Sequence, residues 1–143
     1  MTSPNTVIVP PDYDPEEDQG DFMNPVMLAY FRKLLLDWKK DLLQGMNETI
    51  ANTLQATNLQ KPDIADRASE ETDHALELRT KDRTRKLIKK IDEALQRIED
   101  GEYGYCEETG DEISIPRLKA RPNATLSLEA QERHERKEKT QRD

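Results

Sequence analysis

The segment Lys61-Pro62-Asp63-Ile64-Ala65-Asp66 (KPDIAD) decides the fold, because it separates two long runs of helical periodicity. Pro62 cannot donate a backbone hydrogen bond and disfavours helical geometry at Lys61, so the first helix ends here. Asp63 and Asp66 are both suitable N-caps for a second helix, whose acidic first turns suit the positive end of the helix dipole. The sequence leaves open which aspartate caps it.

Apolar residues on both sides of this turn recur at steps of three and four, the period of one helix face. Asn24 is a good N-cap and Pro25 suits the first helical position, so the first helix begins there. Its stripe comprises Met27, Phe31, Leu34, Leu35, Trp38, Leu42, Met46, Ile50, Leu54 and Thr57. The second stripe comprises Ala68, Thr72, Ala75, Leu76, Thr80, Arg83, Leu87, Ile91, Ala94 and Ile98, broadened by Ile88 and Leu95. The pattern predicts an antiparallel coiled-coil hairpin over residues 24–100, with its tip at 61–69.

Apolar content and charge are unevenly distributed along this hairpin. The stripes are strongest at 34–42 and 87–98, so we expect the tip to be the less stable end. Acidic residues gather near the tip, at Asp63, Asp66, Glu70, Glu71, Asp73 and Glu77. The run RTKDRTRKLIKK then places seven basic residues between Arg79 and Lys90, here called the basic shaft. Such runs are typical of solvated helix faces with i to i+4 ion pairs, and the functional alternative is an acidic probe on a basic shaft.

The flanking segments differ in composition from the hairpin. Residues 1–23 are rich in Pro, Asp and Glu, which predicts a flexible or loosely docked N-terminal arm. Gly101 follows the second helix as a C′ glycine. Residues 101–126 read as turns and short extended pieces, here called the knuckle, with a small core of Ile113, Ile115, Leu118 and Leu126. Residues 127–143 predict a terminal helix capped by Ser127. The expected fold is mainly α: a long antiparallel coiled-coil hairpin on a small globular base that carries this knuckle and a C-terminal helix.

Residues 103–130 have the rhythm of a small zinc ribbon but contain a single cysteine, Cys106. A C-x2-C-x17-C-x2-C pattern anchored there places the other ligands at Thr109, Ser127 and Ala130, which are not zinc ligands of this class. We therefore expect a degenerate zinc-ribbon-like knuckle without metal. Thr109 would hydrogen-bond in a turn, Ser127 would cap the terminal helix, Ala130 would pack, and Cys106 would act as a small half-buried hydrophobe.

The two histidines do not supply the zinc ligands that are missing from this pattern. His74 is expected near the distal part of the hairpin and His134 about two turns into the terminal helix, so neither completes a tetrahedral site in the knuckle. No resident cofactor is expected.

Overall composition restricts the class of partner. The chain is 34% hydrophobic and 36% charged, which favours an elongated or small-cored protein. A net charge of -8 and a pI near 4.9 argue against wrapping nucleic acid, because that needs an excess of Lys and Arg. One cysteine excludes an intramolecular disulfide, and no stretch is typical of a signal peptide or a membrane span. We expect a cytoplasmic monomer with a protein partner and no membrane contact.

The motif DRASEETDHALELRTKDRTRKLIKKIDEALQRIEDGEYGYCE at 66–107, followed by RLKARP at 117–122, resembles the DksA family of RNA polymerase-binding transcription factors, in a zinc-free form. The resemblance spans 24–139 and is densest at 63–122. It implies a coiled coil that enters the secondary channel of bacterial RNA polymerase without binding DNA directly. It further implies a non-enzymatic regulator that destabilises open complexes. With the alarmone ppGpp, such a regulator represses ribosomal RNA promoters and helps activate amino-acid biosynthesis promoters in the stringent response.

The same resemblance implies roles for individual residues. Asp66 and Ala68, with Asp63 nearby, match the functional tip that acts near the polymerase active site. Arg83 falls where the family contacts the channel rim. Leu87, Lys90 and Arg121 match positions of a ppGpp site against the polymerase, and Gln131 departs from the Lys expected in that site.

Two other functions compete with this one. In a Gre-like transcript cleavage factor, Asp63 and Asp66 would hold a second Mg²⁺ for phosphodiester hydrolysis, although the alternation in DIADRAS matches the DksA family better. An adaptor coiled coil with no enzyme partner rests on the charge-rich stripes alone.

Overall fold

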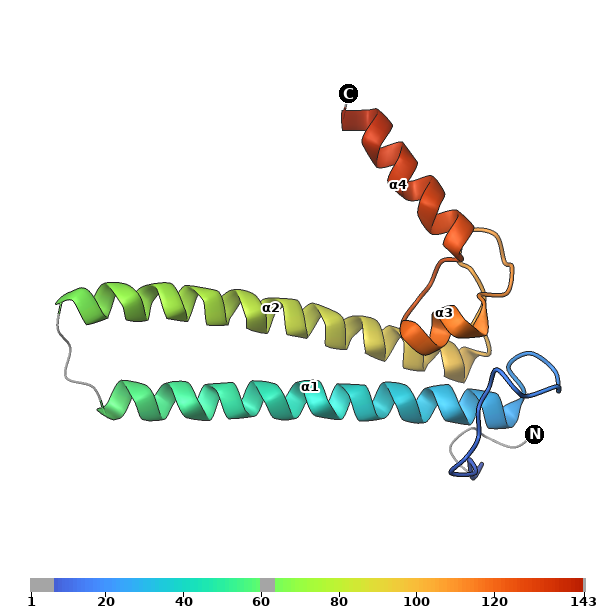
Figure 1. The fold of residues 1–143 in the computed structure, drawn as a ribbon, viewed down its shortest axis with the longest axis horizontal. Helices are drawn as coiled ribbons and strands as arrows, with labels where there is room; N and C mark the ends of the chain where they lie inside the picture. The colour runs from blue at the N-terminus through green and yellow to red at the C-terminus, as the bar shows by residue number, and fades with distance from the viewer. Residues whose placement is uncertain (1–6, 60–63, 143) are drawn as a thin grey trace. The chain divides into compact units, whose positions relative to one another are not determined.

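The computed structural model describes residues 7–59 and 64–142, with the helical backbone alone for 49–59, 64–69, 141 and 142. These residues form four helices: α1 (Pro25–Leu59), α2 (Ile64–Asp100), α3 (Ile115–Ala120) and α4 (Leu128–Arg142) (Figure 1). Within the described ranges, the sole β pairing is an isolated antiparallel bridge between Tyr105 and Glu112. The expectation of a mainly α fold is confirmed.

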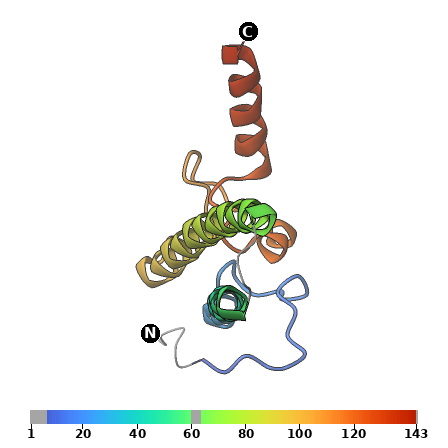
Figure 2. The ribbon, with the colours of Figure 1, turned by 90° about the vertical axis from the view of Figure 1, so that its left-hand side faces the viewer.

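The chain divides into two compact units. The base comprises Met1–Leu36 and Ile91–Asp143, and the distal hairpin comprises Asp37–Lys90. Within the distal hairpin, the α1 and α2 segments run side by side in opposite directions, as the two perpendicular views show (Figures 1 and 2). Residues 60–63, which include the start of the predicted tip, lie outside the described residues.

The distal hairpin contains no buried side chain among those that the structure describes, which are residues 37–48 and 70–90. Leu42 and Leu87 of the predicted stripes are half-buried, whereas Leu76 is 54% exposed. The expectation that Leu76 packs in the stripe is therefore wrong. A pair of helices without a third layer can cover only a narrow seam of each, and Leu76 lies outside it.

The base holds all the buried apolar side chains of the described chain. They are Met23, Met27, Ala29, Phe31, Leu35, Ile91, Ala94, Ile98, Tyr103, Cys106, Ile113, Leu118 and Ala130, together with the prolines Pro15 and Pro122. Ile113 and Leu118 of the predicted knuckle core are fully buried, while Ile115 and Leu126 are half-buried. The first turns of α1 and the last turns of α2 thus share one core with the knuckle.

The ends of the long helices follow the local signals of the sequence. The Asn24 side chain accepts a hydrogen bond from the Met27 N–H at 3.0 Å, which confirms the cap before Pro25. Gly101 follows the last residue of α2 with φ +76° and donates its N–H to the Ile98 carbonyl at 3.2 Å. A left-handed residue at this position is readily supplied by glycine, as predicted.

The helix α3 was not expected, since residues 101–126 predicted turns and short extended pieces. It begins because the Ser114 side chain accepts a hydrogen bond from the Arg117 N–H at 3.4 Å and because Pro116 suits the first turn. Leu118 anchors it in the core with no exposed surface. Its six residues are too few to display helical periodicity, which explains the wrong prediction.

None of the described helices combines the length and the apolar character that crossing a membrane requires.

Candidate functional site

The predicted tip residues lie where the structure gives the least detail. Asp63 is outside the described residues. Asp66 and Ala68 lie in the first turns of α2, which begins at Ile64, and only their backbone is described. Their roles stay predictions.

The basic shaft lies on the α2 segment of the distal hairpin. Arg83 and Lys90 are exposed, and Leu87 is half-buried. Lys90 lies three positions after Leu87 on a continuous helix, so the two are neighbours on its surface. The segment therefore presents cationic groups beside partly exposed apolar surface, a combination suited to a polar partner surface or to a phosphate.

Arg121 is the C-cap of α3, with φ −135° and ψ 86°. Its N–H donates to the Arg117 carbonyl at 2.8 Å, and its carbonyl accepts from the Ala124 N–H at 3.0 Å. The residue is exposed. A guanidinium here can reach an anion with a bidentate pair of hydrogen bonds.

Gln131, the position where the resemblance expects a Lys, lies in the first turn of α4 and is half-buried. Its side-chain amide donates to Glu135 Oε1 at 3.3 Å. An amide brings no positive charge to a phosphate, so this position supports anion binding less than Lys would.

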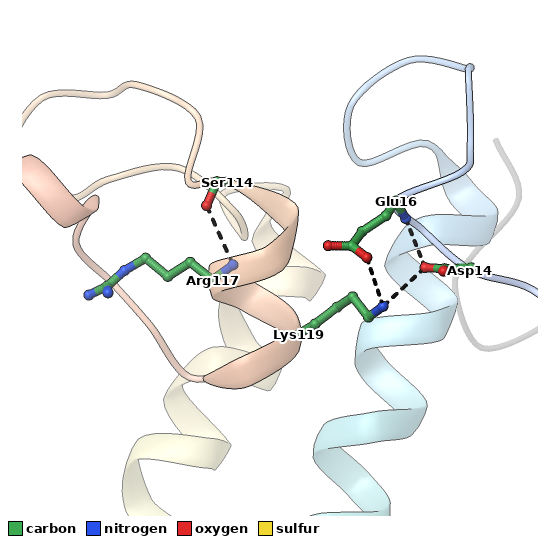
Figure 3. A network of polar contacts seen from close by, with 5 residues as sticks. All are labelled: Asp14, Glu16, Ser114, Arg117 and Lys119. Atoms are coloured by element: carbon green, nitrogen blue, oxygen red, sulfur yellow. Dashed lines mark hydrogen bonds and ion pairs between the residues drawn. The ribbon is translucent and has the colours of Figure 1, made fainter.

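The sequence did not predict a cluster that joins the N-terminal arm to α3, here called the clasp (Asp14, Glu16 and Lys119). Lys119 Nζ lies 3.2 Å from Asp14 Oδ1 and 3.1 Å from Glu16 Oε2. The Glu16 N–H also donates to Asp14 Oδ1 at 3.0 Å. Figure 3 shows Lys119 reaching both carboxylates while Arg117, on the same helix, points away from them.

The clasp shifts the titration of its members. The Glu16 N–H and the Lys119 ammonium lower the pKa of Asp14 below its usual value. Hydrogen bonds to Glu16 and Asp14 raise the pKa of Lys119. Both shifts favour the charged pair.

Apolar and aromatic contacts hold the same part of the arm. Pro15, between the two clasp carboxylates, is fully buried. The Tyr13 ring lies edge-on to Tyr30 of α1, with centroids 5.7 Å apart, and the Tyr13 hydroxyl donates to Asp18 Oδ2 at 2.6 Å. The described part of the arm is thus held on the base by specific contacts.

Cys106 is not the half-buried hydrophobe that the sequence suggested. It is 3% exposed. Burial raises the pKa of its thiol, but hydrogen bonds from the Ser127 backbone, from the Thr109 side chain and backbone and from the Glu108 backbone outweigh burial and lower that pKa to about 6. Cys106 is therefore more deeply buried than the sequence suggested, and nearby donors favour its thiolate form.

The other three positions of the zinc pattern, Thr109, Ser127 and Ala130, do not fit a zinc ion. The Thr109 hydroxyl accepts from the Asp111 N–H at 3.2 Å, and the Ser127 hydroxyl accepts from the Ala130 N–H at 3.2 Å. Ala130 is fully buried and offers only a methyl group. The predicted turn, cap and packing roles are confirmed. One thiol, two engaged hydroxyls and a methyl group are not a zinc donor set.

Two side chains that the sequence analysis missed organise the knuckle. Arg97, near the end of α2, donates to the carbonyls of Tyr105 at 2.7 Å and Glu102 at 3.2 Å and pairs with Glu107 at 3.1 Å. The Tyr103 hydroxyl donates to the Pro122 carbonyl at 2.7 Å. A local sequence window cannot reveal these contacts, although a Tyr beside a Gly-rich turn is a candidate for such a bond.

His134, considered above as a metal ligand, pairs with Glu108 through its Nε2 atom. This contact links α4 to the knuckle. His74 lies near Glu77 on the distal hairpin, with Nδ1 to Oε2 at 3.9 Å. Among the residues that the structure describes, no three His, Cys, Asp or Glu side chains gather as metal ligands.

Comparisons with known proteins agree with these features. The family described as DnaK suppressor protein DksA, N-terminal domain, matches residues 27–98, and the prokaryotic dksA/traR C4-type zinc finger matches residues 101–136. A protein of Caulobacter vibrioides named RNA polymerase-binding transcription factor DksA is 55% identical over 143 residues, covering 100% of this chain and 99% of its own length. A protein of the same name from Escherichia coli is 42% identical over 87% of this chain and 82% of its own.

A solved structure agrees as well. The structure of transcription factor DksA2 from Pseudomonas aeruginosa superposes with a TM-score of 0.77 at 39% identity, covering 85% of this chain and 94% of that one. The chain matches the zinc-finger family over the knuckle while lacking three of the four thiols that a C4 site needs.

Proposed function

The chain belongs to the DksA family, and from this premise we propose that it binds bacterial RNA polymerase and regulates transcription initiation. The relatives compared above are named as transcription factors rather than enzymes, which supports a regulator without catalytic chemistry of its own. We further propose that it works in the cytoplasm as a monomer and makes no direct contact with DNA. The net charge of -8 supports the last point.

The hairpin is the element proposed to enter the polymerase through its secondary channel. α1 has 35 residues, so at 1.5 Å per residue it is roughly 50 Å long. The distal hairpin is two helices thick and buries none of its described side chains, a shape suited to a narrow pore. Arg83, exposed on the basic shaft, is proposed to contact the channel rim.

The tip is proposed to act near the polymerase active site. Asp66, with Asp63 and Ala68 beside it, would repel the nucleic-acid backbone or bias a nearby Mg²⁺ or mobile catalytic element through charge. This action changes the lifetime of the open complex. It explains repression of ribosomal RNA promoters, which is the proposed physiological output together with activation of amino-acid biosynthesis promoters.

The alarmone ppGpp is the proposed effector, bound between this protein and the polymerase. Lys90 supplies a point charge and Arg121 a bidentate fork for phosphate, and Leu87 supplies adjoining apolar surface. Gln131 contributes an amide where a Lys is expected, so the response should be weaker than with Lys at this position.

The observation that carries the proposal is the 55% identity to a DksA protein along the entire chain, arm included. It is tested by transcription in vitro from a ribosomal RNA promoter, with and without ppGpp, using the wild type and Asp66→Asn. We expect Asp66→Asn to bind polymerase nearly as well as the wild type. Unlike the wild type, it should no longer alter the open-complex lifetime measured for polymerase alone. Asp82→Asn is the matched control, because it removes the same charge from an exposed position of the same helix.

The same preparations distinguish the competing functions. Shortening of nascent RNA in stalled complexes, lost in Asp66→Asn, would establish a Gre-like cleavage factor instead. Failure to co-purify with core polymerase would favour an adaptor coiled coil. An Asp66→Asn protein that regulates like the wild type would remove Asp66 from the mechanism.

A further inference from the structure

The backbone around Arg121 is fixed on both sides of the residue. Its N–H is held by the Arg117 carbonyl at 2.8 Å and its carbonyl by the Ala124 N–H at 3.0 Å. The next residue is Pro122, which restricts the conformation of Arg121 and is itself buried. The exposed guanidinium therefore extends from a point with little freedom.

Tyr103 contributes the remaining tie at this point. Its hydroxyl donates to the Pro122 carbonyl at 2.7 Å, across 19 residues of sequence. The side chain is 2% exposed, and its ring lies 5.6 Å from the ring of Phe31, a fully buried residue of α1. Burial raises the pKa of Tyr103, so the hydroxyl stays protonated and remains a donor. The core of the base thus holds the carbonyl that follows Arg121.

We propose that Tyr103 is a positioning residue for phosphate recognition by Arg121, which rests on the function proposed above. A long Arg side chain loses conformational freedom when it binds an anion with both arms of its fork. A fixed backbone lowers this entropy cost of binding, because the guanidinium already samples fewer directions before the anion binds. Tyr103 never touches the phosphate and acts through the Pro122 carbonyl.

The hydroxyl can be removed without the ring by Tyr103→Phe. Tyr105→Phe is the matched control, because it deletes a hydroxyl two positions away and keeps the ring that packs edge-on against Phe22. Both proteins and Arg121→Ala are assayed for open-complex lifetime on a ribosomal RNA promoter over a series of ppGpp concentrations. The readouts are the concentration for half-maximal effect and the affinity for polymerase without ppGpp.

We expect Tyr103→Phe to raise the half-maximal ppGpp concentration between about twofold and tenfold, the range set by one net hydrogen bond. Polymerase affinity without ppGpp should stay at the wild-type value. Tyr105→Phe should match the wild type, and Arg121→Ala should lose most of the response. Pro122→Ala provides a second variant that loosens the same point and leaves Tyr103 intact, so its expected shift has the same direction.

Other results overturn the inference. An unchanged half-maximal concentration in both Tyr103→Phe and Pro122→Ala, with Arg121→Ala impaired, shows that Arg121 needs no positioning and leaves the proposed function standing. If Tyr103→Phe weakens the affinity for polymerase without ppGpp by the same factor as it raises the half-maximal ppGpp concentration, Tyr103 supports the base as a whole. If the wild type regulates the promoter but does not respond to ppGpp, the inference and the proposed role of ppGpp are both overturned. The proposed binding to polymerase is then still supported.

Discussion

The base and the distal hairpin use segments of the same two helices, α1 and α2, and stabilise them by different means. In the base, Phe31, Leu35 and Ile91 have no exposed surface, and contacts join residues far apart in sequence. In the distal hairpin, Leu76 and Leu78 are 54% and 62% exposed. Buried area dominates folding stability, so the base should carry most of the free energy of unfolding.

This difference explains where functional substitution is tolerated. Arg83 and Lys90, two residues proposed to meet the polymerase or its effector, are exposed on α2, where changes of charge leave little packing to disrupt. Arg121 differs, because it is exposed while its backbone N–H and carbonyl are both hydrogen-bonded within the base. Changes around it should affect stability and function together.

The largest expected effect comes from the base core. Phe31→Ala should reduce the free energy of unfolding by about 3 to 5 kcal/mol, because it deletes a fully buried ring packed against Tyr30 and Tyr103. Leu78→Ala in the distal hairpin should change it by less than about 0.5 kcal/mol. Urea unfolding followed by circular dichroism measures both. Similar losses from the two variants would break the contrast between the units.

Two glycines provide a comparison of opposite sign. Gly104 has φ +92°, and a Cβ there would lie 2.8 Å from Met23 Cε, so Gly104→Ala should cost about 2 to 4 kcal/mol. Gly45, inside α1 of the distal hairpin, has open space around the added methyl group. Gly45→Ala should stabilise by up to about 1 kcal/mol, because alanine is the better helix former. Thermal melts of both variants give the signs, and a stabilising Gly104→Ala would contradict the tight approach of Met23.

The clasp should have a smaller effect, visible in its dependence on pH and salt. Asp14→Asn and Lys119→Met should each lower Tm slightly at neutral pH. The decrease in Tm of the double variant should be smaller than the sum of the two single decreases. The folded-state pKa of Asp14 is lowered from 3.8, so its contribution is present above that value and lost as pH falls through the folded pKa. The folded-state pKa of Lys119 is raised from 10.5. Its contribution to folding stability is therefore present below pH 10.5 and is lost as pH rises through the folded pKa.

Glu17→Gln is the control for the clasp, since it removes an exposed charge from the same arm without touching Lys119. Its melting temperature should stay near that of the wild type. Added salt should narrow the gap between the wild type and Asp14→Asn, because these carboxylates are partly exposed. A gap that persists unchanged at low pH would show that Asp14 acts through something other than its charge.

These contrasts also separate what the sequence could predict from what it could not. The long helices, the cap at Asn24 and the glycine at Gly101 depend on neighbours within one or two turns, so local patterns were sufficient. The clasp joins residues 105 positions apart, and the Tyr103 hydrogen bond spans 19. No periodicity records such pairings, because they arise only when the chain has folded.

For the candidate site too, the sequence predicted some features and the structure alone shows others. Motif matching assigned Arg83, Leu87, Lys90 and Arg121 their proposed roles, and the structure adds how the backbone of Arg121 is held. The sequence predicted a half-buried Cys106, whereas the residue is 3% exposed, because sequence spacing gives its relation to other thiols and says nothing of how deeply it is buried. The Asp66 tip depends on family resemblance alone.

The smallest expected effect is that of metal removal, where we expect none. The knuckle is tied by Arg97, Tyr103 and the Ser127 cap, so EDTA should leave Tm unchanged and peroxide should not unfold it. The control is the triple variant Thr109→Cys, Ser127→Cys and Ala130→Cys, which restores four thiols. Once loaded with zinc it should become EDTA-sensitive, because its knuckle then gains binding free energy that a chelator can remove. A large fall in the wild-type Tm with EDTA would show that a metal, and not these side chains, stabilises the base.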